Sequence, residues 1–241
     1  MFIKLKDKIK NFIYKVVPLP YTNESFSQAG EDCCIDFLFS QLKISRPSYL
    51  ELGVYKPKLA SNTYRFYKNG ATGVLVEADK SLIEEIKRVR PKDTILNIGV
   101  GFDEVTYADF YIFEEPAHNT FNKQAAEYRV KFGSYKLVKI EKIVLKSINT
   151  IISENFKSTP HFLSIDIEGL DLDVLKSLDF NKYPIPVICA ETCTYSETHI
   201  KPKDKSIEEF MLQIGYFVYA DTYINTIFVN KHWFNYVRRL S

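Results

Sequence analysis

Short apolar runs that end in a glycine or a carboxylate constrain the fold of this chain more than any other feature. The run Tyr49–Leu52 leads into Gly53, and the run Gly73–Val76 ends at Glu77. Later apolar runs end at Gly99, Asp166 and Glu191. Segments with helical spacing lie between these runs, and such alternation is typical of a parallel sheet with helices on both faces. The sequence therefore predicts a doubly wound α/β fold.

The strand ends also predict where a ligand binds. Parallel strands bring their carboxyl ends to one edge of a sheet, where α/β proteins hold their ligands. A buried carboxylate is costly unless it is paired, hydrogen-bonded or bound to a cation, so several strand-end carboxylates favour a site. A glycine turn followed by a strand ending at Glu77 is typical of ribose binding. The GxGxxG pattern is absent because Tyr55, Lys56 and Pro57 follow Gly53, which argues against a dehydrogenase.

Two pairs of strands depart from this alternation. Residues 108–113 and 137–144 have alternating patterns, and we expect a β-hairpin insertion there, after strand three. Residues 216–220 and 226–230 predict a C-terminal antiparallel hairpin. We expect a domain over residues 23–241, with a separate helix over residues 1–22.

That N-terminal segment carries apolar residues at helical spacing among lysines. A basic amphipathic helix can lie on an anionic membrane, or pack its apolar stripe on the domain or on a second subunit. Both interpretations stay open, as do peripheral membrane contact and a homo-oligomer.

Composition excludes several classes of protein. The chain has 32 basic and 30 acidic residues and a formal net charge of +2, which does not favour nucleic acid as a partner. Neither a membrane-spanning run nor a signal peptide is evident. The cysteines lack CxxC spacing, and we expect reduced thiols at Cys33, Cys34, Cys189 and Cys193. We therefore predict a cytoplasmic protein, with membrane association left open.

The segment Asp166–Gly169 is the strongest candidate for chemistry. One of its carboxylates could take a proton from a substrate hydroxyl, or Asp166 and Glu191 could hold a divalent cation such as Mg²⁺ or Mn²⁺. In a purely structural alternative, Glu168 and Asp171 only begin the next helix. His118 and His199 lie in polar loops that could face the crevice.

Motifs spread from about Ser27 to Val229 are specific when taken together. They are Ser27–Asp32, Glu51–Gly53, Ser61–Tyr64, Phe66–Gly70, Val76–Ala78, Glu115–Phe121, Phe162–Gly169 and Asn225–Val229. In these motifs the chain resembles the FkbM family of S-adenosylmethionine-dependent methyltransferases. The strongest element is Ser164–Gly169, followed by Val174 and Leu175.

The resemblance implies a Rossmann-like class I methyltransferase fold with a seven-stranded sheet. It places Glu51, Gly53 and Glu77 at the cofactor and Asp166 at the reacting methyl group. The full set of predicted cofactor contacts is Gln28, Glu51, Gly53, Asn62, Glu77, Ala78, Gly99 and Asp166. The predicted acceptor contacts are His118, Asn119, Thr120 and Glu168, and the predicted catalytic residues are Asp166, Glu191 and His199.

Two departures from the family pattern concern the first turn. The family usually has aspartate where this chain has Glu51, and a second glycine is replaced around Pro57. We predict an O-methyltransferase that acts on a hydroxyl of a sugar or glycan precursor. The alternatives are another nucleotide-dependent sugar-modifying enzyme, such as a dehydratase or dehydrogenase, and a non-catalytic binding protein on the same fold.

Overall fold

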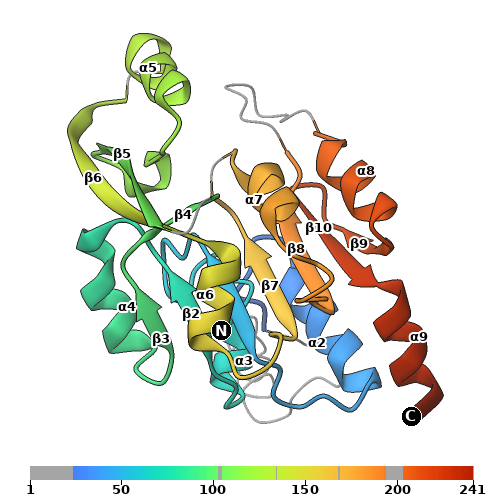
Figure 1. The fold of residues 1–241 in the computed structure, drawn as a ribbon. Coiled ribbons are helices and arrows are strands. Elements are labelled where there is room, and N and C mark those ends of the chain that lie inside the picture. Colours follow the sequence, from blue (N-terminus) through green and yellow to red (C-terminus); the bar gives the residue numbers. More distant parts are fainter. Residues whose placement is uncertain (1–23, 103–104, 134, 168, 194–202, 241) are drawn as a thin grey trace, which may run out of the picture.

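The computed structural model describes residues 24–102, 105–133, 135–167, 169–193 and 203–240. The helix predicted over residues 1–22 lies outside these ranges. A seven-stranded sheet has the strand order β3-β2-β1-β7-β8-β10-β9 (Figure 1). The strands are β1 (Tyr49–Leu52), β2 (Gly73–Val76), β3 (Thr94–Leu96), β7 (Phe162–Ile165), β8 (Val187–Glu191), β9 (Tyr216–Asp221) and β10 (Asn225–Asn230).

Strand directions confirm the predicted fold class. Strands β3, β2, β1, β7 and β8 pair in parallel, whereas β10 runs antiparallel to both β8 and β9. The last two strands therefore form the predicted C-terminal hairpin. Strand three ends at Leu96, before the Gly99 at which its apolar run ends. The side chain of Asn97, the next residue, donates to the carbonyl oxygens of Glu77 and Ala78.

Helices cover both faces of this sheet. They are α2 (Glu31–Gln41), α3 (Tyr64–Lys68), α4 (Ile83–Val89) after the 3-10 turn η1 (Lys80–Leu82), α6 (Ile148–Asn155), α7 (Asp171–Ser177), α8 (Ser206–Gln213) and α9 (Lys231–Leu240). Leu50 and Leu52 of β1 pack in one apolar cluster with residues of α6, α7 and α8. Tyr49 packs in the second cluster with residues of α2, α3 and α4. Successive side chains of β1 thus point to opposite faces of the sheet, and helices pack on both faces.

Local capping agrees with the sequence at η1 and differs at α8. Asp79 is of a residue type that caps helices, and its carboxylate accepts from the Ser81 amide at 2.8 Å. The spacing of Ser206 and Glu209 predicts a capping box at α8. That prediction is wrong, because α8 starts after Lys205 without a side-chain cap, and the Ser206 amide donates to Asp204 at 2.8 Å.

A second, three-stranded sheet has the order β4-β6-β5. It consists of β4 (Gly99–Gly101), β5 (Val105–Phe113) and β6 (Leu137–Ser147), and its connection carries the 3-10 turn η2 (Pro116–His118) and α5 (Lys123–Phe132). Strands β5 and β6 pair antiparallel at the positions where alternating strands were predicted. Figure 1 shows α5 at the outer end of this sheet, away from the central sheet.

Candidate active site

A cavity of about 240 Å³ opens between the two sheets at the carboxyl ends of β1, β2 and β7. Its walls come from the Gly53 turn, from the residues after β2 and β7, and from the second sheet with η2. The position agrees with the rule that open α/β sheets bind ligands beyond the carboxyl ends of their strands.

Gly53 allows two strand ends to meet at the cavity. Its φ angle is +80°, and a Cβ atom at this position would lie 1.9 Å from the carbonyl oxygen of Asp166. Its amide donates to the carbonyl of Val76 at 3.0 Å, which ties the turn to β2 as well. A larger residue would push Asp166 away from the turn.

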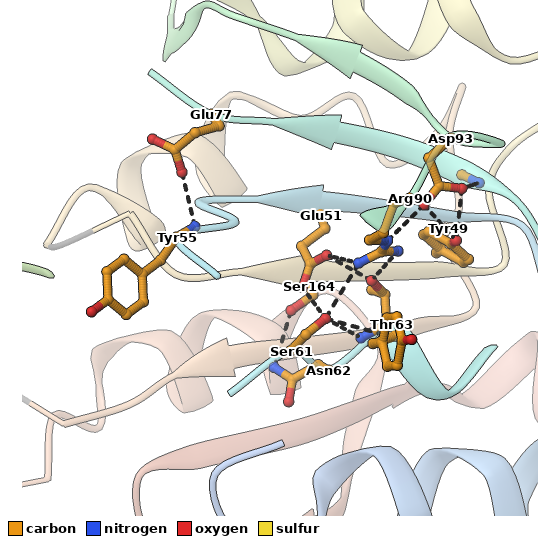
Figure 2. Close-up of polar contacts among 12 residues, drawn as sticks. Tyr49, Glu51, Tyr55, Ser61, Asn62, Thr63, Glu77, Arg90, Asp93 and Ser164 are labelled. Carbon is orange, nitrogen blue, oxygen red and sulfur yellow. Dashed lines mark hydrogen bonds and ion pairs between the residues drawn. The ribbon is translucent and has the colours of Figure 1, made fainter. Parts of the chain in front are cut away.

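Glu77 is the buried carboxylate of the cavity, with 7% of its surface exposed. The amide of Tyr55 donates to one of its oxygens at 2.9 Å (Figure 2). The amide of Asp79 donates to the other oxygen at 2.7 Å. Burial raises the pKa of Glu77 despite these hydrogen bonds. Each carboxylate oxygen accepts about two hydrogen bonds, so Glu77 can accept further donors such as the paired hydroxyls of a ribose.

Apolar side chains from both sheets form the wall beside Glu77. Leu82 and Ile98 contribute from the side of the central sheet, and Phe110 and Phe121 from the second sheet. The two phenyl rings pack with centroids 4.5 Å apart. A Cβ atom on Gly99 would lie 2.5 Å from the Phe121 ring, so glycine is needed there for close packing. This wall suits an aromatic base.

Asp166 lies at the other side of the Gly53 turn, because β7 and β2 flank β1 in the sheet. Its amide donates to the carbonyl of Leu52 at 3.1 Å. The loop after it is held by Asp171, whose carboxylate accepts from the amides of Ile167 and Gly169, both at 3.2 Å. Burial, with a contribution from Glu191, raises the pKa of Asp171 to about 6.

The cavity brings together many of the residues predicted from the sequence. Those that line it are Gln28, Gly53, Glu77, Ala78, Gly99, Asn119, Thr120 and Asp166. Asn119 is also a structural residue. Its side chain accepts from the Phe113 amide and donates to the Asp79 carboxylate, both at 2.8 Å.

Glu51 and Asn62 were predicted at the cofactor, but the structure places both outside the cavity lining. The Glu51 carboxylate accepts from Thr63 Oγ1 at 2.6 Å and from Arg90 Nη1 at 3.0 Å (Figure 2). Asn62 donates to Ser164 Oγ at 3.1 Å. A buried arginine needs a charged partner, and Glu51 supplies one to Arg90.

Two more predicted residues, His118 and Glu191, are described but do not line the cavity. The His118 ring packs against Tyr135 with centroids 4.0 Å apart. Glu168 and His199 fall outside the described residues. Within the described ranges, no group of three or more His, Cys, Asp and Glu side chains could hold a metal ion, so the cation predicted at Asp166 and Glu191 has no support there.

Sequence reasoning missed Tyr55, Phe110 and Phe121 as cavity residues. Tyr55 comes two residues after Gly53, and this position next to the predicted turn could have identified it as a cavity residue. Phe110 and Phe121 looked like ordinary strand and loop residues, because their place beside the cavity depends on how the second sheet packs.

Several solved methyltransferases are similar to this chain in structure. An O-methyltransferase from Bacillus cereus, in complex with SAH, has 11% identity and a TM-score of 0.43, covering 93% of this chain and 90% of that one. The SAH-bound methyltransferase PaMTH1 of Podospora anserina has 9% identity and a TM-score of 0.45, covering 92% and 86%. A putative RNA methyltransferase from Pyrococcus horikoshii has 12% identity and a TM-score of 0.42, covering 92% and 97%.

The family of the chain follows from the sequence comparisons. No curated protein matches the chain. The family model described as a methyltransferase FkbM domain matches residues 51–218, which is more than half of the 241 residues. The chain therefore belongs to the FkbM family of S-adenosylmethionine-dependent methyltransferases.

Proposed function

We propose that this protein transfers a methyl group from S-adenosylmethionine to a hydroxyl of a sugar or glycan precursor. The observation that carries the proposal is the pair of carboxylates, Glu77 and Asp166, which line one cavity on either side of the Gly53 turn. Glu77 can bind the ribose of the donor, while Asp166 can orient the acceptor hydroxyl and take its proton.

The residues of the cavity fit the donor. When bound, S-adenosylmethionine supplies a methyl group on a positively charged sulfur. Glu77 accepts hydrogen bonds from the ribose hydroxyls, and the wall with Leu82 and Phe121 packs against the adenine. Gly53 keeps the β1 turn free of a side chain that would clash with the Asp166 backbone.

Asp166 is the proposed catalytic residue. It orients the acceptor hydroxyl and takes its proton as the oxygen attacks the methyl carbon and the bond from that carbon to sulfur breaks. Positioning of the reactants alone can lower such a barrier by about 7–11 kcal/mol. A general base adds roughly a hundredfold to ten-thousandfold. Carboxylates also accept hydrogen bonds from sugar hydroxyls, which supports a carbohydrate acceptor.

Calorimetry with S-adenosylmethionine tests the donor half of the proposal. E77Q removes the charge at nearly constant shape, and we expect donor affinity to fall roughly tenfold to a hundredfold, since a hydrogen bond to a charged group contributes about 1.5–3 kcal/mol. The matched control is E84Q on the exposed face of α4, which should bind as the wild type does. The proposal fails if the intact protein does not bind the donor or if E77Q binds it equally well.

The acceptor half is tested by incubating protein and donor with a candidate glycan pool and measuring a mass increase of one methyl group. D166N should lose most of this activity while its affinity for the donor stays near that of the wild type. Donor binding without methylation of any hydroxylated acceptor would instead favour a non-catalytic binding protein.

Other predictions from the sequence remain proposals. One of them is a divalent cation at Asp166 and Glu191. An activity that changes neither with EDTA nor with added Mg²⁺ or Mn²⁺ would contradict it. Catalytic roles of Glu191 and His199 are likewise proposed, as are a homo-oligomer and membrane contact through residues 1–22. The proposed contacts with the acceptor are His118, Asn119, Thr120 and Glu168. In the described part of the chain, no helix has the length and apolarity needed to cross a bilayer.

A further inference from the structure

We propose that Tyr55 is a positioning residue that latches the η2 segment over the cavity and thereby slows exchange of the methyl donor. The inference rests on the proposed function, because it takes the donor to occupy this cavity. Tyr55 and the η2 residues Pro116 and Ala117 belong to opposite walls, and all three line the cavity.

The backbone of Tyr55 is held in an unusual conformation. Its φ angle is +49°, in the left-handed region that a bulky residue rarely adopts. Its amide donates to Glu77 at 2.9 Å, so the conformation is held by the same carboxylate that we assign to the ribose. Strained backbone of this kind gathers at ligand sites, where the surrounding contacts maintain it.

The side chain of Tyr55 joins the β1 turn to the residue just before η2. Its phenol donates to the Glu115 carboxylate at 2.9 Å, a contact between residues 60 positions apart in the chain. Burial and the nearby Glu115 both raise the pKa of the phenol, so its hydroxyl stays protonated and can donate even in alkaline solution. The Lys56 ammonium lies 5.5 Å from the centroid of the Tyr55 ring and helps to hold it.

Both ends of the η2 segment are held by contacts that do not involve Tyr55, and at the first end the Glu114 amide donates to the Lys136 carbonyl at 3.1 Å. At the second end, Asn119 donates to Asp79 at 2.8 Å, and these two residues are only 8% and 3% exposed. Glu115, which lies between these ends, is exposed, and so is its hydrogen bond to Tyr55. Breaking a buried hydrogen bond is costly, whereas an exposed one is readily replaced by water.

Glu114 and Asn119 therefore anchor the segment, and Tyr55 is its latch. Release of Glu115 from Tyr55 loosens the stretch between the two anchors, which carries Pro116 and Ala117. A donor held by Glu77 also stabilises the Tyr55 backbone, because both use the same carboxylate. Donor binding and latch closure therefore favour each other.

The test measures the dissociation rate of S-adenosylhomocysteine from the full chain by surface plasmon resonance. Y55F removes the donating hydroxyl and keeps the ring, and E115Q weakens the acceptor. We expect each to raise the dissociation rate by about threefold to tenfold, the range for one such hydrogen bond. The double variant Y55F/E115Q should dissociate no faster than Y55F, since Y55F already removes the contact that E115Q weakens.

The matched control is E114Q. Glu114 is the neighbour of Glu115 and is also exposed, but it pairs with Lys136 instead of a cavity residue. Its dissociation rate should equal that of the wild type. In urea unfolding, all four variants should stay folded and keep a cooperative transition, because the latch is one exposed hydrogen bond. An unchanged rate in Y55F, or effects of Y55F and E115Q that multiply in the double variant, would overturn the latch. A wild-type protein that binds neither donor nor product would overturn the proposed function itself, and the latch with it.

Discussion

At the scale of single residues, Gly53 controls the geometry of the cavity in two ways. It adopts a left-handed backbone, and it lets the carbonyl of Asp166 approach to a distance at which a Cβ atom would overlap. The sequence predicted a glycine turn here, but only the structure shows that the close neighbour is Asp166. The same residue therefore shapes the turn and places the proposed catalytic carboxylate.

These two contributions can be separated by comparing G53A with G215A. Gly215 also has a left-handed φ, +91°, but a Cβ atom there would meet nothing within 4 Å. G215A should lose roughly 1–2 kcal/mol of unfolding free energy from backbone conformation alone. G53A should lose clearly more, about 3 kcal/mol or above, because overpacking adds to the strain. Urea unfolding measures both, and equal losses would show that the approach of Asp166 is unimportant.

At the scale of elements, a buried polar cluster joins α4, β1 and β2. Arg90 follows α4, and its side chain is fully buried. It donates to Asp93 at 2.8 Å, to Glu51 at 3.0 Å and to Thr63 at 2.8 Å (Figure 2). Burial disfavours its charge, but Glu51, Tyr49 and Asp93 outweigh burial and raise the pKa of Arg90. The cluster lies behind the Gly53 turn and explains why Glu51 does not line the cavity.

We expect this cluster to support stability and to leave donor binding to other residues. R90M should lose roughly 3–5 kcal/mol of unfolding free energy, because it leaves buried carboxylates without a partner. E51Q should lose less, about 1–3 kcal/mol, and the double variant should lose less than the sum. The control R88M, on the exposed part of the same helix, should change stability by less than about 0.5 kcal/mol.

Donor affinity decides between the two roles of Glu51. If Glu51 is structural, the affinity of E51Q for S-adenosylmethionine should lie within about twofold of the wild type. A tenfold lower affinity in fully folded E51Q would instead indicate that Glu51 contacts the cofactor. The family's usual aspartate at this position makes E51D a useful companion, which keeps the charge but shortens the reach toward Arg90.

At the scale of the whole molecule, two apolar clusters stabilise the faces of the central sheet, and a smaller one, with Ala78, Phe110 and Ile112, joins the second sheet to it. The cavity lies along the junction made by that smaller cluster.

Buried groups also make the stability of the molecule depend on pH, and Asp171 is the clearest case. It is 4% exposed, and its pKa is raised from 3.8 to about 6 by burial and by Glu191 on β8.

The sign of this pH dependence follows from the direction of the shift. Between pH 4 and 6 the folded protein keeps a proton on Asp171 that the unfolded chain has lost, so raising the pH through this window removes stability. The wild type should lose up to about 3 kcal/mol relative to D171N between pH 4 and 7. Urea unfolding of both proteins across this range measures the difference, and parallel curves would contradict it.

The sequence by itself determined the elements and the strand-end residues of this protein. Apolar periodicity and glycine turns are local properties, so β1 and β2 were predicted at their observed bounds, and Gly53, Glu77 and Asp166 were predicted at one edge of the sheet. Only the tertiary structure decided which side chains meet. Glu51 pairs with Arg90, 39 positions away, and Tyr55 bonds to Glu115 in the connection between β5 and β6. Such pairings depend on how separate elements pack, and no local pattern encodes them.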